Sequence, residues 1–264
     1  MTTQLLAGFF LAVLVALAAF GARSLSRSGA LAAALVGTVM FGIGGWRWAA
    51  LLLTFFITSS ALSRAFKTRK RGLSEKFSKG SQRDAGQVFG NGGLATFFAG
   101  LWFFFPGQIW VWAAFAASLA AVNADTWATE LGVLNPHPPR LITSLEIVEK
   151  GTSGGISLIG TLAALAGSAL IGGLAALLAP LTVSPWLAVW VTLAGFFGAL
   201  FDSFLGATAQ AIYFCPNCQK ETERHPLHTC GAPTTLLRGW RWLDNDRVNF
   251  ACALFAVLVV VILV

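Results

Sequence analysis

Eight long apolar segments set the strongest limit on how this 264-residue chain can fold. The hydrocarbon layer of a membrane is about 30 Å thick, so a helix of about 20 apolar residues crosses it once. Only 11% of the residues are charged, against roughly 25% in soluble domains. The segments fall at residues 4–22, 29–45, 46–65, 92–106, 109–131, 155–179, 186–212 and 248–264. We expect an all-α polytopic transmembrane helix bundle of about eight spans, with residues 1–264 forming a single membrane domain.

The distribution of basic residues tests the number of spans. The fourth segment is short, and only Gly44 and Gly45 separate the second from the third, so seven or nine spans stay open. Eight spans place all of the 18 Lys and Arg residues except Arg47 on one face of the bilayer. Because cytoplasmic loops carry an excess of Lys and Arg, this face is expected to be cytoplasmic. The pattern predicts a multi-pass protein of the cell (inner) membrane with both termini outside.

The net charge of +7 follows from the same basic loops. In a soluble protein this charge would suggest nucleic acid, but in a membrane protein it reflects topology and attracts anionic lipids or phosphate ligands. We expect membrane lipids as partners and no nucleic acid. The first 20 residues carry no charged side chain, unlike the basic start of a cleavable signal peptide, so the first segment is expected to remain as a helix.

Three acidic residues lie inside the expected spans: Asp125 and Glu130 in the fifth and Asp202 in the seventh. A charge near the bilayer centre costs about 2.5–3.5 kcal/mol, so such residues usually face a cavity or a partner. Carboxylates and the amide oxygen of Asn123 are hard ligands of the kind that Mg²⁺ takes together with substrate phosphates. The alternative is an acid paired with Lys or Arg for assembly. The polar neighbours of these acids favour a functional site.

Helix geometry limits how these acids can share one site. Asp125 and Glu130 point about 140° apart on an ideal helix, so both reach one cavity only if their helix is central in the bundle or locally unwound. Gly198 and Gly206 flank Asp202 at four-residue spacing and permit a close approach of neighbouring segments.

Two glycine clusters are expected to open helices on the basic face. Free N–H groups and the positive end of a helix dipole bind phosphate there, and Thr152 or Ser153 could cap the sixth span. One cluster precedes the fourth span at Gly90–Gly93 and includes Asn91. The other precedes the sixth span and consists of Lys150, Gly151, Thr152, Ser153, Gly154 and Gly155. Because its lysine comes first, it is not a Walker A motif, and a flexible interfacial turn is the alternative.

A basic run extends from Arg64 to Arg83 between the third and fourth spans. One interpretation is that the run serves only as an anchor for lipid headgroups. Its last part mixes Lys, Arg, Ser and Gln donors, which suits phosphate binding through Lys76, Lys79 and Arg83. Both interpretations stay open.

Cysteine and histidine cluster in the loop between the last two spans, residues 213–247. Cys215, Cys218, His228 and Cys230 fit C-x₂-C-x₉-H-x-C, and thiolate and imidazole ligands in tetrahedral number suit structural Zn²⁺. His225 competes with His228 for the fourth position. The alternative is a loop of free cysteines that binds no metal.

The loop ends in an acidic and amide-rich segment, residues 244–249. Acids at a helix N-terminus are expected from capping and the helix dipole alone. The alternative is that Asp246 and Asn249 join a metal or phosphate site at the membrane surface.

Five ordered motifs resemble a family of integral membrane proteins from bacteria, plants and animals. This transmembrane-protein-nineteen-like family includes plant phytyl-phosphate kinase. The motifs are NADTWATELG at 123–132, KGTSGGIS at 150–157, GALFDSFLGATAQ at 198–210, the Cys/His segment at 215–231 and DNDRVN at 244–249. The resemblance implies a membrane-embedded kinase that uses a nucleoside triphosphate to phosphorylate an isoprenoid monophosphate such as phytyl phosphate. Related phytol kinases use CTP, which makes CTP a candidate donor.

The resemblance also implies roles for individual residues. The expected catalytic residues are Asp125, Glu130, Asp202 and Lys150. Mg²⁺ would be held by Asn123, Asp125, Glu130, Asp202 and Asp246. Nucleotide and lipid phosphates would be held by Lys76, Lys79, Arg83, Asn91, Arg140, Gly151, Thr152, Ser153, Gly154 and Gly155. No general base is needed, because the attacking phosphate is already an anion.

Two other functions compete with a kinase. A transporter or flippase would use the intramembrane acids to couple to protons or ions, and would need polar residues toward both faces. The polar residues gather near one face instead. A CTP-dependent lipid-phosphate cytidylyltransferase would use the same ligands and release pyrophosphate, and the sequence does not separate it from a kinase.

Overall fold

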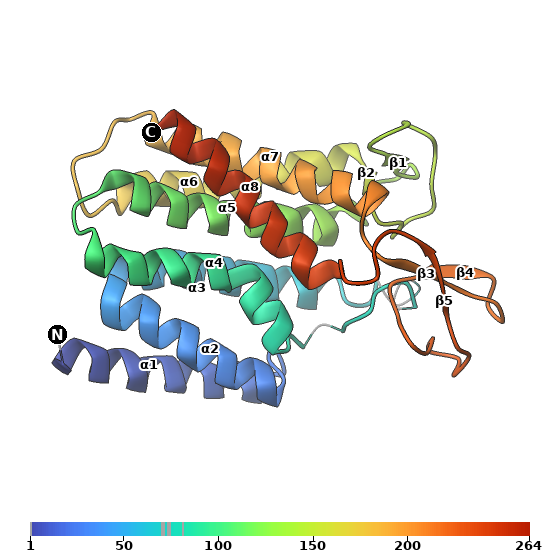
Figure 1. Cartoon of the computed structure of the whole chain (residues 1–264), viewed down its shortest axis with the longest axis horizontal. Helices are drawn as coiled ribbons and strands as arrows, with labels where there is room; N and C mark the ends of the chain where they lie inside the picture. The colour runs from blue at the N-terminus through green and yellow to red at the C-terminus, as the bar shows by residue number, and fades with distance from the viewer. Residues whose placement is uncertain (1, 70–71, 73–74, 81) are drawn as a thin grey trace.

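The computed structural model describes residues 2–69, 72, 75–80 and 82–264. In this part of the chain, eight α-helices of 13 or more residues form a bundle (Figure 1). They are α1 (Thr2–Gly21), α2 (Arg27–Val39), α3 (Trp46–Ala65), α4 (Ala85–Phe104), α5 (Ile109–Gly132), α6 (Leu158–Leu177), α7 (Leu187–Thr208) and α8 (Asn245–Leu263). A π-helical turn, η1 (Met40–Gly44), extends α2. The structure confirms a polytopic helical membrane protein.

Seven helical segments of the described chain are long and apolar enough to cross a membrane: α1, α2 with η1, α3, α5, α6, α7 and α8. The remaining helix, α4, has 20 residues, and Gln87, Asn91 and several glycines lower its hydropathy. Both chain ends lie at the end of the bundle opposite the β-strands (Figure 1). An even number of crossings produces this arrangement, so α4 also runs the length of the bundle.

Polar caps decide where two of the helices begin, and these starts differ from those expected from hydropathy. The helix α4 begins at Ala85 rather than at residue 92, because Asp84 and Gln87 form a reciprocal cap with N···O distances of 2.9 and 3.2 Å. The helix α6 begins at Leu158 rather than at residue 155, with Ser157 as its cap. Cap residues are polar, so an apolar segment does not reveal where its helix starts.

Helix α5 is the centre of the bundle. It packs against α3, α4, α6, α7 and α8, and every residue from 111 to 124 is buried. Small residues allow this enclosure. A Cβ on Gly195 of α7 would lie 2.5 Å from the Cβ of Ala120, and one on Gly198 would lie 2.8 Å from that of Ala121. The close approach expected at Gly198 is confirmed.

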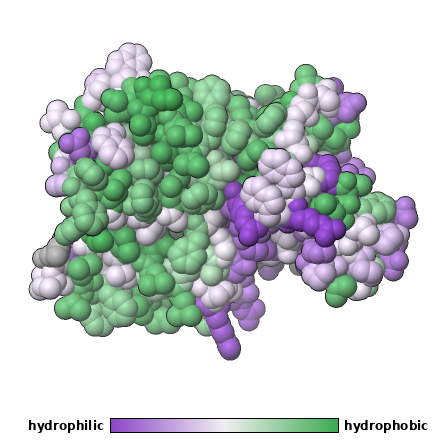
Figure 2. All heavy atoms as spheres, viewed as in Figure 1, coloured by the Kyte–Doolittle hydropathy of each residue, from purple (hydrophilic) through white to green (hydrophobic). Residues whose placement is uncertain are grey.

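Short strands and loops form one polar end of the bundle. Strand β1 (Arg140–Leu141) pairs antiparallel with β2 (Gly155–Ile156). Between α7 and α8, the strands β3 (Ile212–Cys215), β4 (Lys220–Thr222) and β5 (Thr235–Arg238) form a sheet in the order β4-β3-β5. Figure 2 shows hydrophilic atoms gathered beside this sheet, whereas apolar side chains cover the helices. The apolar surface is the part that suits contact with lipid tails.

Candidate functional site

A polar cavity of about 1060 Å³ lies among the helix ends at the polar end of the bundle. Its walls come from α3 to α8, from the loops between them and from the turn between α1 and α2. The residues singled out in the sequence that line it are Lys79, Arg83, Asn91, Asp125, Glu130, Lys150, Gly151, Thr152, Ser153, Gly154, Gly155, Asp202 and Asn249. The fold therefore brings segments that are far apart in the sequence around one space.

The carboxylates reach the cavity from two helices. Asp125 and Glu130 both line it, because α5 is central and the cavity extends around its end. On α7, Oδ2 of Asp202 is buried and has no hydrogen-bond partner among the described residues. Asp125 and Glu223 are close enough for their charges to interact with Asp202. Because buried polar atoms are nearly always paired, this oxygen indicates a site for a ligand or cation.

Glu130 has neighbours of its own. Its Oε1 accepts a hydrogen bond of 2.7 Å from Oγ of Ser63 on α3, and its charge attracts the guanidinium of Arg83. These contacts connect Glu130 to the basic loop. They set it apart from the pair Asp125 and Asp202.

The carboxylates fit Mg²⁺ if a ligand completes its coordination. Among the described residues, no three carboxylates bring their oxygens together closely enough to form a metal site by themselves. Mg²⁺ is usually held by one or two carboxylates together with substrate phosphates and water. Asp125 and Asp202 meet this requirement, because both line a cavity large enough for a phosphate ligand.

Asn123 lies deeper in the bundle than the cavity. Its Nδ2 donates to the carbonyl oxygen of Gly167 on α6 at 2.7 Å, and its Oδ1 accepts from Oγ1 of Thr58 on α3 at 3.3 Å. The side chain is fully buried. The structure therefore shows Asn123 joining three helices, while the cavity begins nearer to Asp125.

Neither glycine cluster opens a helix. Ser157 caps α6, so the expectation that Thr152 or Ser153 is its cap is wrong. The cluster Gly90–Gly93 lies inside α4, because that helix starts at Ala85. Phosphate binding by the segment 150–155 would therefore depend on Lys150 and loop N–H groups, and not on a helix dipole.

The segment 150–155 is held against α7. Gly154 has a φ of +85°, and a Cβ there would lie 2.5 Å from the backbone nitrogen of Ala207. Oγ of Ser153 donates to Oε1 of Gln210 at 2.7 Å. Nζ of Lys150 donates to the carbonyl oxygen of Asn135 at 2.7 Å while the residue lines the cavity. Only glycine fits at position 154, because both the backbone conformation and the contact exclude a side chain.

Lys79 joins the basic loop to α8. Its ammonium pairs with Asp84 at 3.0 Å and with Asp246 in the first turn of α8. Burial lowers the pKa of Lys79, but the hydrogen bonds and charges of these two carboxylates outweigh it and raise the pKa. Asp246 is thus engaged with Lys79 and does not line the cavity. The structure places its carboxylate beside the site, as a partner of the lysine.

The other expected phosphate ligands lie outside the cavity walls. Lys76 pairs with the exposed Glu149 at 2.8 Å, and Arg140 donates to the carbonyl oxygen of Leu145 at 2.8 Å. Both contacts hold loops together at the polar end. Lys70 and Arg71, which belong to the same basic run, lie outside the described residues.

Sequence patterns did not point to Glu223, which lines the cavity just after β4. Its carboxylate accepts hydrogen bonds from the backbone N–H of Ser78 at 3.2 Å and from Nε2 of Gln210 at 3.0 Å. Burial raises the pKa of Glu223, although these bonds act in the opposite direction. No periodic pattern marks a loop acid, so only the tertiary contacts reveal it.

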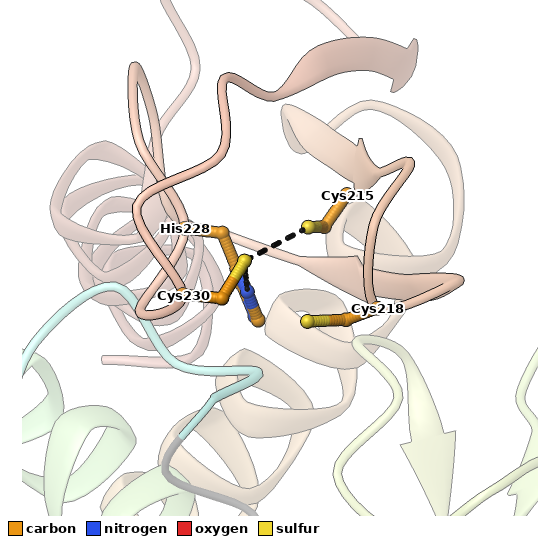
Figure 3. Close-up of side chains that lie close together, drawn as sticks. All are labelled: Cys215, Cys218, His228 and Cys230. Carbon is orange, nitrogen blue, oxygen red and sulfur yellow. Dashed lines mark hydrogen bonds between the residues drawn. The ribbon is translucent and has the colours of Figure 1, made fainter.

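Cys215, Cys218, His228 and Cys230 converge at the end of the three-stranded sheet (Figure 3). Their ligand atoms all lie within 4.8 Å of one another, so this group could hold a metal ion. The sulfurs of Cys215 and Cys230 are 3.7 Å apart. Tetrahedral zinc with Zn–S bonds of about 2.3 Å places its sulfurs about 3.8 Å apart, which fits Zn²⁺. The group contains His228 and not His225, whose ring stacks on Tyr213.

The sheet that carries the Cys/His group also holds the basic loop. Oγ1 of Thr222 donates to the carbonyl oxygen of Glu75 at 2.6 Å. The backbone N–H of Glu223 donates to the carbonyl oxygen of Lys76 at 2.8 Å. Lys220 pairs with Glu75 at 2.9 Å. The position of Lys79 in the cavity wall therefore depends on this sheet.

Curated relatives from plants and archaea match most of the chain. Protein PGR of Arabidopsis thaliana is 34% identical over 95% of this chain and 93% of its own length. The uncharacterized membrane protein MJ0933 of Methanocaldococcus jannaschii is 35% identical over 65% of this chain and 71% of its own length. Protein VTE6, chloroplastic, of Arabidopsis thaliana is 29% identical over 85% of this chain and 61% of its own length. No solved structure shows a significant match.

A family comparison covers almost the same region. Residues 10–257 match the model described as integral membrane protein DUF92. This match reaches into every helix of the bundle and includes every residue that lines the polar cavity. The chain therefore belongs to the DUF92 family of integral membrane proteins.

Proposed function

We propose that this protein is a membrane-embedded kinase that transfers a phosphoryl group from a nucleoside triphosphate to an isoprenoid monophosphate. The observation that carries the proposal is one polar cavity surrounded by intramembrane carboxylates, a lysine-bearing glycine loop and further basic side chains that include Lys79 and Arg83. The sequence resemblance to the family that includes plant phytyl-phosphate kinase supplies the substrate class. Phytyl phosphate is the candidate acceptor and CTP the candidate donor.

The reaction needs positioning and charge neutralisation more than covalent chemistry. An oxygen of the isoprenyl phosphate attacks the terminal phosphorus of the triphosphate. The bond from that phosphorus to the bridging oxygen breaks, which gives isoprenyl diphosphate and a nucleoside diphosphate. No base is required, since the attacking phosphate is ionised at neutral pH.

The residues divide into two groups under this proposal. Asp125 and Asp202 hold Mg²⁺, which neutralises phosphate charge when bound. Lys150 and the loop from Gly151 to Gly155 hold the nucleotide phosphates, while Lys79 and Arg83 hold the phosphate of the lipid. Glu130 positions Arg83 through their opposite charges.

The Cys/His group has a structural role in the proposal. Four protein ligands would close a Zn²⁺ site and leave no position for substrate. Bound zinc would hold the sheet that fixes Glu75, Lys76 and, through them, Lys79. We assign the basic face and its cavity to the cytoplasmic side, because cytoplasmic loops carry an excess of Lys and Arg. Nucleoside triphosphates are available on that side.

Packing around α5 argues against a transporter. A transporter needs an aqueous path to both faces, with polar groups along it. Residues 111–124 of α5 are buried, and this half of the helix packs through Trp112, Phe115 and alanines. The polar cavity therefore occupies one end of the bundle.

One assay tests the proposal. Purified protein in detergent is incubated with phytyl phosphate, Mg²⁺ and each nucleoside triphosphate in turn, and the lipid products are separated. Phytyl diphosphate supports the kinase. A nucleotide-linked lipid with release of pyrophosphate would indicate a cytidylyltransferase instead, and no turnover with any donor would overturn both enzymes.

A further inference from the structure

A second cavity, of about 330 Å³, lies among α1, α2, α3 and α4. Its walls are apolar or aromatic except at three residues, Arg83, Gln87 and Asn91. Those same three residues also line the polar cavity. The two cavities therefore meet at Arg83, Gln87 and Asn91, with apolar walls on one side and polar walls on the other.

Arg83 is fixed at this junction. Its backbone N–H donates to the carbonyl oxygen of Ser24 at 3.0 Å, and its carbonyl oxygen accepts from the N–H of Ser26 at 2.9 Å, so it is tied to the turn between α1 and α2. Its guanidinium lies 5.4 and 5.6 Å from the ring centroids of Phe55 and Phe56. Burial lowers the pKa of Arg83 to about 10, and Glu130 opposes this, so the side chain keeps its positive charge at neutral pH.

The apolar cavity is elongated along α3. Its lining runs from Trp46 to Phe56 on that helix, which at 1.5 Å per residue is about 15 Å. Its volume lies at the lower end of the ~300–1,000 Å³ range of small-molecule sites. An apolar space of this length with a cation at its polar boundary has the chemistry of a site for one hydrocarbon chain with an anionic head.

We propose that this cavity binds the isoprenoid tail of the lipid phosphate, with the phosphate held at Arg83 on the boundary with the polar cavity. The inference rests on the proposed function for the identity of the tail. The helices α1 to α4 thereby form the lipid-binding part of the protein, and α5 to α8 carry the carboxylates and the glycine loop. Gln87 and Asn91 of α4 lie between the two parts and face both.

A photolabelling experiment tests where the tail lies. The probe is an isoprenyl phosphate with a diazirine on its tail, added to the full-length protein in nanodiscs of phosphatidylcholine. We expect labelled peptides from the cavity walls, in residues 11–19 of α1 and 49–56 of α3. Unlabelled isoprenyl phosphate in excess should remove the label, whereas the same concentration of isoprenol, which lacks the phosphate, should not. Label that neither competitor removes would show adventitious lipid only and overturn the inference.

Filling the cavity gives an independent test. Ala33→Phe and Ala49→Phe each place a large side chain on its wall, and overpacking of this kind displaces what occupies the space. We expect KM for phytyl phosphate to rise at least about tenfold, and KM for a five-carbon isoprenyl phosphate to change less than about twofold. Ala18→Phe is the matched control, because Ala18 is exposed on α1 and does not line the cavity.

The two experiments separate failure of this inference from failure of the proposed function. If no donor supports turnover but competed labelling still maps to α1 and α3, the kinase proposal falls and the lipid-phosphate site stands. If the protein makes phytyl diphosphate while the label maps to other helices, the kinase stands and the apolar cavity is excluded as the tail site. Equal KM values for phytyl phosphate in Ala33→Phe, Ala49→Phe and the control Ala18→Phe would also exclude the apolar cavity as the tail site.

Discussion

The carboxylate of Glu223 accepts a hydrogen bond of 3.2 Å from the backbone N–H of Ser78, a residue 145 positions earlier in the chain. This bond connects the three-stranded sheet to the basic loop inside the cavity wall. It also links the position of that loop to the ionisation of a buried acid, because burial raises the pKa of Glu223.

The first prediction concerns pH. Since the folded pKa of Glu223 is raised above its ordinary value of 4.5, its contribution to stability is complete below that value and is lost as pH rises through the folded pKa. Glu223→Gln removes this titration. We expect the melting temperature of the variant, minus that of the wild type, to increase from pH 4.5 to pH 8 in detergent. A difference that is constant or falls with pH would contradict the burial of this carboxyl.

The second prediction concerns Asp202. Asp202→Asn keeps the shape of the side chain and removes the charge beside Asp125, so it should weaken metal and phosphate binding in the cavity. We expect kcat/KM to fall about 100-fold or more with little change in melting temperature. Glu146→Gln, a matched change on an exposed loop outside the cavity, should keep wild-type turnover. Wild-type turnover in Asp202→Asn would remove this residue from the site.

The third prediction compares two lysines of one loop. Lys79→Met leaves the carboxylates of Asp84 and Asp246 without their shared cation, and Asp246 is largely buried. We expect a loss of about 1–2 kcal/mol in the free energy of unfolding. Lys76→Met breaks a pair with the exposed Glu149 and should cost about 0.5 kcal/mol or less. Equal costs would mean that the pairing of Lys79 is no stronger than a surface ion pair.

The fourth prediction concerns the metal content. Protein purified without chelator should contain one zinc per chain by elemental analysis. Cys230→Ser and His228→Ala should lose it, whereas His225→Ala should keep it, since His225 stacks on Tyr213 away from the group. Zinc retained in His228→Ala and lost in His225→Ala would reverse the assignment of the fourth ligand.

The fifth prediction concerns a glycine in the loop before α6. Gly154→Ala forces a side chain into a φ of +85° and against the backbone of Ala207. We expect it to destabilise the protein by about 1–3 kcal/mol and to raise KM for the nucleotide. Gly173→Ala is the control, because nothing lies within 4 Å of the added methyl group and alanine favours a helix. A Gly154→Ala protein as stable as this control would contradict the tight packing of the loop.

Apolar length and charge placement were enough to predict the bundle and the helices that carry Asp125, Glu130 and Asp202. Both signals depend on local composition and on the cost of placing charge in hydrocarbon. Helix geometry allowed Asp125 and Glu130 to reach one cavity only if their helix was central in the bundle or locally unwound. The enclosure of α5 by other helices shows that it is central.

Features that depend on tertiary contacts could not be predicted in this way. One local feature was also missed: the start of α4 at Ala85 depends on the cap that Asp84 forms with Gln87, in a stretch too polar for a hydropathy search. Glu223 enters the cavity only because its sheet packs on the basic loop. Motif spacing assigned His228 and left His225 as a competitor, and the structure brings His228 to the cysteines while His225 stacks on Tyr213.

The enclosure of α5 has a consequence for how this protein is made. Its covering helices come from both sides of it in the sequence, α3 and α4 before it and α6 to α8 after it. During synthesis α3 and α4 can pack on α5 as it enters the bilayer, but the side that meets α8 stays open to lipid until α8 itself has left the ribosome. The carboxylates of α5 therefore remain in an unfinished wall until α8 is made, and a chain that stops before Asn245 would leave one side of its central helix exposed.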